Sequence, residues 1–357
     1  MKTSMADASS DLRMRQCGQL GVIELNRPHA LNALTLGMVR ALTRQLRLWA
    51  QADEIAAIVL TGAGDKAFCA GGDVRALYDW GQQGAPEASD FYREEYQLNH
   101  MLKTSAKPVL ALMHGVTMGG GAGLALPARW RFVGPGFRFA MPETGIGLFP
   151  DVGGSFYLSR LRGECGVWLA LTGARLGAAE ACALGLGTHY LTADGVAAFR
   201  AALEEGRDWQ ALAELAAPPP PASGEALDEA RSARCFGGAA VAEILAALKA
   251  EGSAWGEAQA QAMQRNSPLS SAVALRQIRL GAGLSFADCL RMEFRLAVRM
   301  MQQPDFYAGV RAVLLEKTGQ PRWAHASHRE VGEQLVDAIF AELGDKELHL
   351  EEGANET

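Results

Sequence analysis

The chain has 357 residues, 49% hydrophobic and 21% charged, which allows a sizeable core in one large domain with an appendage or in two domains. Its formal net charge of −6 disfavours extended nucleic-acid binding, although a local basic patch for a phosphorylated ligand stays open. No segment reaches about 18 uninterrupted apolar residues, so we expect no membrane partner.

Six cysteines are scattered singly, with no CxxC pair and no spacing typical of metal ligands. The first fifteen residues carry no apolar core of a secretory signal, and we expect residues 1–15 to be disordered. These features predict reduced thiols, no metal site and a cytoplasmic location.

The first half of the chain alternates apolar runs with helical patterns. Three runs predict buried strands, at residues 20–25, 56–61 and 108–113. Thr35 is a plausible helix cap before apolar residues at helical spacing. Further helices are expected from about Val74 and over residues 90–102, and residues 62–73 are expected to form a long loop. The alternation predicts a right-handed α/β core with parallel strands.

Two glycine-rich turns each follow an apolar strand. One contains Gly71 and Gly72, and the other contains Gly119, Gly120 and Gly121 before a small apolar helix. One such turn alone is equally consistent with tight packing. Because parallel α/β proteins bind ligands beyond the carboxyl ends of their strands, two such turns could each aim one N–H at a single oxygen.

Two carboxylates, Glu143 and Asp151, follow in loops rich in glycine and proline amid apolar neighbours. Carboxylates in such surroundings are candidates for proton transfer or nucleophilic attack. Asp151 could instead form a turn after Pro150. His114, which precedes a glycine at a strand end, is interpreted as structural, and the dinucleotide, P-loop, HExxH and GxSxG motifs are absent.

From Gly153 onward the pattern is mostly helical. Residues 158–176 and 178–184 predict helices, residues 188–191 a short extended piece, and four prolines begin a connection at Pro218. Beyond it we expect amphipathic helices at residues 239–250, 254–265, 267–279, 285–301 and 309–315. The predicted divisions are a core at 16–217, the connection at 218–224, a helical region at 225–342 and a mobile acidic tail at 343–357.

Three segments resemble the enoyl-CoA hydratase/isomerase (crotonase) superfamily: KAFCAGGD, HGVTMGGGAGL and MPETGIGLFPDVGG. More narrowly, FPDVGG and the REEY of FYREEYQLNH resemble its 3-hydroxyisobutyryl-CoA hydrolase subgroup. The resemblance runs from about Gly18 to Trp323, although Ala308 stands where the subgroup tends to have Glu. It implies a spiral of β-β-α turns with a helical C-terminal region, in place of a doubly wound sheet.

The resemblance also implies a site. The N–H groups of Gly72 and Gly120 would form an oxyanion hole for the thioester oxygen. Hydratases of the superfamily use two glutamates, and Gly123 stands in the place of the first while Glu143 matches the second. The hydrolase pattern implies that Glu143 acts with Asp151, and that Glu95 lies near the acyl group, although Glu95 could be a solvated helix residue. The further substrate-binding candidates are Ala70, Asp73 and Lys66, the last toward the phosphates of coenzyme A.

These expectations favour hydrolysis of a short branched 3-hydroxyacyl-CoA thioester, as in valine breakdown, with no cofactor because coenzyme A is part of the substrate. Glu143 would attack the carbonyl to form an anhydride, or would activate water. The alternatives are another crotonase reaction, such as double-bond isomerisation with one glutamate, and a non-catalytic acyl-CoA-binding protein. Family members often form trimers and hexamers, so a homo-oligomer is possible.

Overall fold

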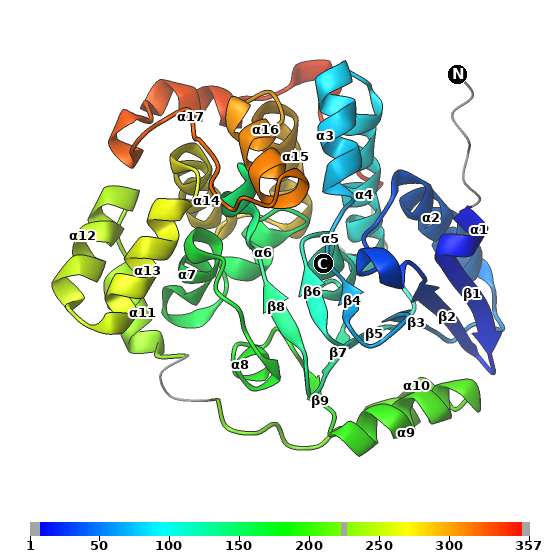
Figure 1. The fold of residues 1–357 in the computed structure, drawn as a ribbon. Helices are drawn as coiled ribbons and strands as arrows, with labels where there is room; N and C mark the ends of the chain where they lie inside the picture. The colour runs from blue at the N-terminus through cyan, green and yellow to red at the C-terminus, as the bar shows by residue number, and fades with distance from the viewer. Residues whose placement is uncertain (1–7, 223–226, 352–357) are drawn as a thin grey trace.

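The computed structural model describes residues 8–222 and 227–351, and its larger sheet has six strands (Figure 1). In spatial order these strands are β1 (Leu12–Cys17), β2 (Leu20–Leu25), β3 (Ala57–Gly62), β5 (Val109–Met113), β7 (Trp130–Val133) and β9 (His189–Tyr190). Only β1 and β2 pair antiparallel, and every other neighbouring pair in this sheet is parallel. The three strands predicted at 20–25, 56–61 and 108–113 correspond to β2, β3 and β5, so the predicted parallel pairing is confirmed.

A second, three-stranded parallel sheet accompanies the first. Its strands are β4 (Ala67–Cys69), β6 (Val116–Met118) and β8 (Arg138–Ala140). Each of the successive pairs β3–β4, β5–β6 and β7–β8 therefore contributes one strand to each sheet before the chain turns into the next pair. This is the expected spiral of β-β turns with intervening helices, and the α/β fold with a helical C-terminal region is confirmed.

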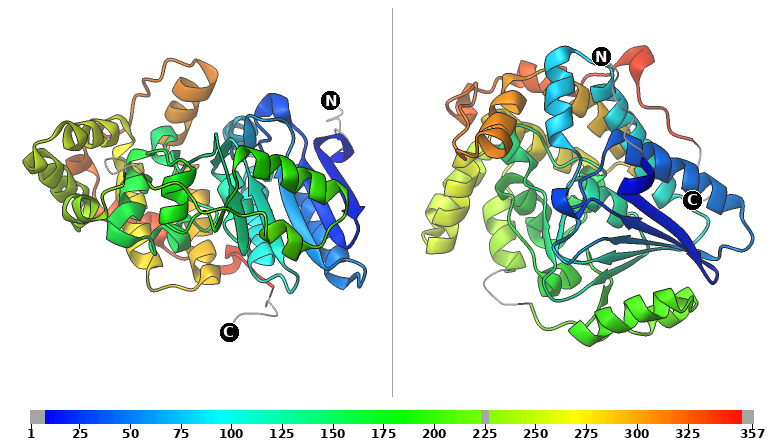
Figure 2. Two further views of the ribbon diagram at one scale, coloured as in Figure 1. Left: turned by 90° about the horizontal axis from the view of Figure 1, so that it is seen from below. Right: turned by 45° about the vertical axis from the view of Figure 1, so that its right-hand side comes forward.

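The larger sheet is buried on both faces, which explains its nearly continuous apolar strands. Alternate residues such as Val59 and Leu110 pack with α9 (Ala193–Glu204) and α10 (Trp209–Ala213), which lie against one face (Figure 2). The intervening residues, such as Ile58, belong to the main core together with α2 (Leu36–Gln51). Thr35 caps α2 as predicted, since its hydroxyl accepts a hydrogen bond from the N–H of Met38.

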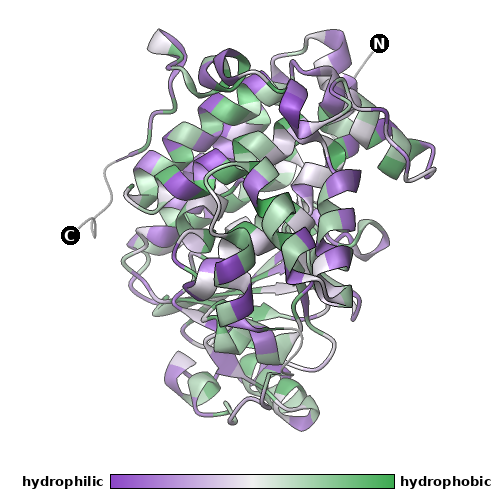
Figure 3. Cartoon of the chain, turned by 90° about the vertical axis from the view of Figure 1, so that its left-hand side faces the viewer, coloured by the Kyte–Doolittle hydropathy of each residue, from purple (hydrophilic) through white to green (hydrophobic). Residues whose placement is uncertain are grey.

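The remaining helices divide between the spiral and the C-terminal half. The spiral carries α1 (Ala8–Asp11), α3 (Val74–Gln83), α4 (Glu87–Lys103), α5 (Gly120–Ala125), α6 (Gly154–Leu158), α7 (Cys165–Thr172) and α8 (Ala178–Ala183). The C-terminal half carries α11 (Glu229–Phe236), α12 (Val241–Glu251), α13 (Ala254–Arg265), α14 (Pro268–Gly281), α15 (Phe286–Met300), α16 (Pro304–Val310) and α17 (Glu333–Phe340). Many of these helices are amphipathic, with hydrophobic and hydrophilic residues on different sides (Figure 3).

Four expectations about local structure need correction. The start predicted as disordered forms α1 and β1 from Ala8 onward, while residues 1–7 lie outside the described part. Strand β4 lies inside the stretch predicted as one long loop. The helix expected over residues 158–176 is interrupted because Gly163 and Glu164 both have positive φ (61° and 58°). The helix expected at 309–315 is largely one π-helical turn, Arg311–Leu315.

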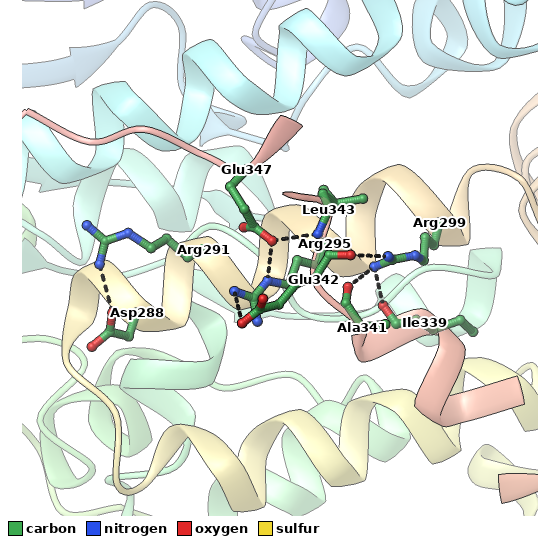
Figure 4. Close-up of polar contacts among 9 residues, drawn as sticks. All are labelled: Asp288, Arg291, Arg295, Arg299, Ile339, Ala341, Glu342, Leu343 and Glu347. Carbon is green, nitrogen blue, oxygen red and sulfur yellow. Dashed lines mark hydrogen bonds and ion pairs between the residues drawn. The ribbon is translucent and has the colours of Figure 1, made fainter. Parts of the chain in front are cut away.

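The segment predicted as a mobile acidic tail packs on the molecule as far as Glu351, and residues 352–357 lie outside the described part. Arg295 of α15 pairs with Glu347 at 2.8 Å, and neighbouring Arg299 donates to main-chain carbonyls of residues 339, 341 and 342 (Figure 4). On the other side, Arg93 of α4 donates to the carbonyls of Lys346 and Glu347. The segment therefore ties α15 to α4.

Residues 218–222 of the proline-rich connection have no regular structure, and residues 223–226 lie outside the described part. Among the described residues, we find no helix whose length and apolar character would let it cross a bilayer.

Candidate active site

A cavity of about 1230 Å³ opens where the two glycine turns meet α4 and the loop after β8. Seven of the eight residues predicted from the sequence line it: Ala70, Gly72, Asp73, Glu95, Gly120, Glu143 and Asp151. They come from separate turns of the spiral, so the fold and not the chain order brings them together. The volume is sufficient for a ligand larger than most drug-sized molecules.

The two glycine turns touch one another at the cavity wall. Gly71 (φ 126°) and Gly119 (φ 46°) have backbone angles that side-chain-bearing residues rarely adopt. A Cβ atom built on Gly119 would lie 3.3 Å from the Cα of Gly71. One built on Gly72 would lie 2.9 Å from the ring of Phe91. Only glycines allow this approach of the two backbones.

The main-chain N–H groups of Gly72 and Gly120 are available to donate hydrogen bonds to a ligand. Gly120 is the first residue of α5, so its N–H has no partner within the helix. Within the described residues, neither amide donates a hydrogen bond to another part of the protein. A developing negative charge on an oxygen between them would be stabilised by both donors.

Glu143 starts a short 3-10 helix, Glu143–Ile146, directly after Pro142. Its side chain is buried, and its Oε2 has no hydrogen-bond partner among the described residues. The other carboxylate oxygen lies 3.4 Å from the position of a Cβ built on Gly119. Burial raises the pKa of Glu143 well above its ordinary value, and the nearby charge of Asp151 raises it further.

Asp151 lies in the loop between the 3-10 helix and α6. Its Oδ2 accepts a 2.9 Å hydrogen bond from the hydroxyl of Tyr96, which comes from the middle of α4. Burial raises the pKa of Asp151 to about 6, against the opposing effect of the Tyr96 hydrogen bond. Asp151 therefore keeps its proton to a higher pH than an exposed aspartate does.

Glu95 is not a solvated helix residue, because only 2% of its surface is exposed. A Cβ built on Gly120 would lie 2.4 Å from its Oε1, and this oxygen has no partner among the described residues. Burial, followed by the charge of Asp151, raises the pKa of Glu95 well above its usual range. Three carboxyl groups therefore share the cavity beside the two free amides.

Asp73 and Lys66 fit their predicted roles as substrate-binding residues less well than the other candidates do. Asp73 lines the cavity but caps α3 through the N–H of Ala76 at 3.2 Å and pairs with Arg27 at 3.3 Å. Lys66 is exposed and does not line the cavity. The positively chargeable residues that do line it are His29, Arg75, Arg175, Arg265 and Lys317. His114 binds the carbonyl of Gly64 at 2.8 Å away from the cavity, in line with its structural interpretation.

Position 123 has no space for a side chain. A Cβ there would lie 2.6 Å from Val152 and 3.0 Å from Nδ2 of Asn99, which donates to the carbonyl of Gly123. Val152 has a φ of 52°, a conformation that is strained for a β-branched residue. The loop carrying Asp151 therefore fills the place in which a second glutamate would stand.

Sequence reasoning missed the residues that support the carboxylates. Tyr92, Tyr96 and Asn99 recur with the predicted Glu95 at intervals of three and four, which places all four on one face of α4. This periodicity was the available signal. Glu293 of α15 gave none, although it is fully buried and accepts from the N–H groups of Gly153 (2.7 Å) and Ser155 (2.8 Å).

No group of three or more histidine, cysteine, aspartate or glutamate side chains in the described ranges is placed to hold a metal ion. The cysteines that the structure describes are all free thiols.

Known proteins are similar to this chain over most of its length. Residues 20–340 match the family described as Enoyl-CoA hydratase/isomerase. The mitochondrial 3-hydroxyisobutyryl-CoA hydrolase of Xenopus laevis is 42% identical over 94% of this chain and 90% of its own length. The Homo sapiens protein of the same name is 38% identical over 96% of this chain and 91% of its own. The cytoplasmic location expected for this chain stays a prediction.

Two solved structures have nearly the same fold. A carnitinyl-CoA dehydratase from Mycobacterium thermoresistibile superposes with a TM-score of 0.90 at 38% identity, covering 96% of this chain and 99% of its own. An enoyl-CoA hydratase from Rhodobacter sphaeroides superposes with a TM-score of 0.88 at 38% identity, covering 96% and 100%. Matches of this extent in both sequence and fold leave one conclusion: the chain belongs to the enoyl-CoA hydratase/isomerase family, in the crotonase superfamily.

Proposed function

We propose that this acyl-CoA enzyme hydrolyses a short branched 3-hydroxyacyl-CoA thioester, 3-hydroxyisobutyryl-CoA, as a step of valine breakdown. The observation that carries the proposal is that buried Glu143, whose Oε2 has no partner among the described residues, shares a cavity with two amides that donate to none of those residues, while position 123 is closed to a second glutamate. The names of the relatives that are about 40% identical support the same reaction.

In the proposed reaction the thioester carbonyl oxygen lies between the N–H groups of Gly72 and Gly120. Removing one such donor typically costs roughly 2.7–4 kcal/mol of transition-state stabilisation. The exposed cations at the cavity, including Arg75, Arg175 and Lys317, would bind the phosphates of coenzyme A. Lys66 contributes at most at longer range, since it lies outside the cavity lining.

Glu143 in its ionised form would then act on the carbonyl carbon. Either its oxygen bonds to that carbon, the C–S bond breaks and water cleaves the resulting anhydride, or Glu143 takes a proton from water that attacks directly. Both routes convert thioester and water to the free acid and the thiol. Asp151, whose pKa is raised to about 6, would orient the substrate or exchange a proton with it.

Hydration of a double bond is disfavoured by the same geometry. Addition of water in this superfamily would use two glutamates for acid and base work, and the space at Gly123 is occupied by Val152 and Asn99. The two solved structures named as a dehydratase and a hydratase share the fold, and the fold alone does not determine the reaction.

The test is release of free thiol from 3-hydroxyisobutyryl-CoA by the wild type and by Glu143→Gln. We expect the substitution to lower turnover by roughly 100- to 10,000-fold, because it removes the acting carboxylate. The matched control is Glu94→Gln on α4, which pairs with Arg40 outside the cavity lining and is expected to leave turnover unchanged.

Near wild-type turnover in Glu143→Gln would contradict the assignment. A wild type that moves a double bond without releasing thiol would indicate an isomerase, and one that binds the thioester without changing it would indicate a binding protein.

A further inference from the structure

Three buried polar atoms at the carboxylate cluster have no hydrogen-bond partner among the described residues. They are the hydroxyl of Tyr92, Oε1 of Glu95 and Oε2 of Glu143, and all three residues line the same cavity. Buried polar groups are normally paired, so unpaired groups that share a cavity indicate that a ligand supplies the missing partner. The proposed function uses Glu143 and leaves Tyr92 unassigned.

Tyr92 is held rigidly one helical turn before Glu95. Its ring makes edge contacts with Phe91 and Tyr96, each with ring centroids 5.9 Å apart. Only 3% of the residue is exposed. Both ring neighbours contact other site residues: the ring of Phe91 packs against Gly72, and the hydroxyl of Tyr96 donates to Asp151.

Three carboxyl groups of the cavity act electrostatically on the Tyr92 hydroxyl. Burial raises its pKa well above the ordinary value, and the charges of Asp151, Glu95 and Glu143 raise it further. The phenol therefore keeps its proton at neutral pH and can act as a donor. Oε1 of Glu95, on the next turn of α4, has no partner among the described residues and can accept a hydrogen bond.

A donor next to an acceptor matches an alcohol, which both accepts and donates a hydrogen bond. We propose that Tyr92 is a specificity residue that donates to the oxygen of the substrate's 3-hydroxyl group, while Glu95 accepts that group's hydrogen. The inference rests on the proposed function and deepens it. An acyl group without the hydroxyl leaves both protein groups unpaired in a buried place, which is how a site rejects such an analogue.

The experiment compares kcat/KM for 3-hydroxyisobutyryl-CoA and for isobutyryl-CoA, which lacks only the hydroxyl. In Tyr92→Phe we expect kcat/KM for the hydroxylated thioester to fall roughly 10- to 100-fold, the range of one strong hydrogen bond. The value for isobutyryl-CoA is expected to stay the same, so the ratio between the two substrates falls by the same factor.

The matched control is Tyr157→Phe. The Tyr157 hydroxyl is also buried and unpartnered among the described residues, but Tyr157 does not line the cavity. The same chemical change there is expected to leave the substrate ratio unchanged. A fall in the ratio with both substitutions would overturn the role of Tyr92.

Binding to the Glu143→Gln protein separates recognition from chemistry. With Tyr92→Phe added, calorimetry is expected to show weaker binding of 3-hydroxyisobutyryl-CoA and unchanged binding of isobutyryl-CoA. Equal effects on both thioesters, or no effect on either, would overturn the inference while thiol release by the wild type still supported the hydrolase. Absence of thiol release by the wild type would instead refute the proposed function.

Discussion

Glu143 combines two properties that oppose each other in one side chain. Its proposed role requires the ionised form, whereas burial favours the neutral form and raises its pKa. The charge of Asp151 acts in the same direction. The activity should therefore depend on pH over a range set by this pair of carboxyl groups, and not by the ordinary pKa of glutamate.

We expect kcat/KM for thioester hydrolysis to rise with pH as the carboxyl pair loses its protons. In Asp151→Asn the negative charge that raises the pKa of Glu143 is gone, so the rising limb should move to lower pH. The measurement is a kcat/KM profile of both proteins from acid to mildly alkaline pH. A limb that stays in place, or moves to higher pH, would show that Glu143 does not titrate under the influence of Asp151.

The sequence allowed prediction of those site residues that stand in local motifs. Gly72, Gly120, Glu143 and Asp151 stand in recognisable segments, and the structure brings them to one cavity. Tyr96 and Glu293 escaped prediction because each acts on a partner distant in the chain, Asp151 and Gly153 respectively, at separations of 55 and 140 residues. The periodicity of α4 could have placed Tyr96 on the same helix face as Glu95, but the partner that each residue meets follows from the fold.

Hydrogen bonds to two C-terminal helices hold the loop that carries Asp151. Glu293 of α15 accepts hydrogen bonds from the N–H groups of Gly153 and Ser155, one to each carboxylate oxygen. Gln277 of α14 donates to the carbonyl of Pro150 on the other side of Asp151. Two helices of the C-terminal half thus fix the position of an aspartate that belongs to the spiral.

Glu293→Gln should lower the free energy of unfolding by about 1–3 kcal/mol, because the amide leaves one of the two buried N–H groups without an acceptor. Turnover should also fall, since the Asp151 loop loses a support. The same change at an exposed glutamate, Glu54→Gln, is the control and should change stability by less than about 0.5 kcal/mol. Denaturant unfolding measures both, and equal midpoints for the two variants would contradict the support.

Among the elements, long periodic segments were predicted well and short ones were not. The predicted bounds of α13 agree with the structure, and those of α14 and α15 differ by one or two residues, because a long helix repeats its amphipathic pattern. Strands β4 and β6 have three residues each and lie beside glycines, so no alternation could develop. The second sheet followed from the resemblance and not from periodicity.

At the scale of the whole molecule, residues 343–351 close the C-terminal half against the spiral. Leu348 is 2% exposed and belongs to the main core, while Arg93 and Gln97 of α4 donate to main-chain carbonyls of the segment. Tyr92, Glu95 and Tyr96 lie on the same helix. The segment therefore covers the side of α4 that faces away from the cavity and stabilises the helix that carries part of the site.

Leu348→Ala should lower the free energy of unfolding by about 2–5 kcal/mol, as large-to-small substitutions in a core do. Leu48→Ala makes the same change at a side chain that is 64% exposed and should cost less than about 0.5 kcal/mol. Thermal or denaturant unfolding of the two variants gives the comparison. Similar losses for both would show that the segment does not contribute to the core.

The fit of Val152 against Gly123 also limits which reactions this chain can reach through single mutations. Introducing a glutamate at position 123 first would force its Cβ into Val152, so that step would be lost through misfolding before any new activity could be selected. Replacing Val152 by glycine first relieves a positive φ and removes the nearer obstacle, after which only Nδ2 of Asn99, 3.0 Å from the Cβ position, would have to shift. The two changes are epistatic, and only one order of them is open to evolution or to stepwise engineering.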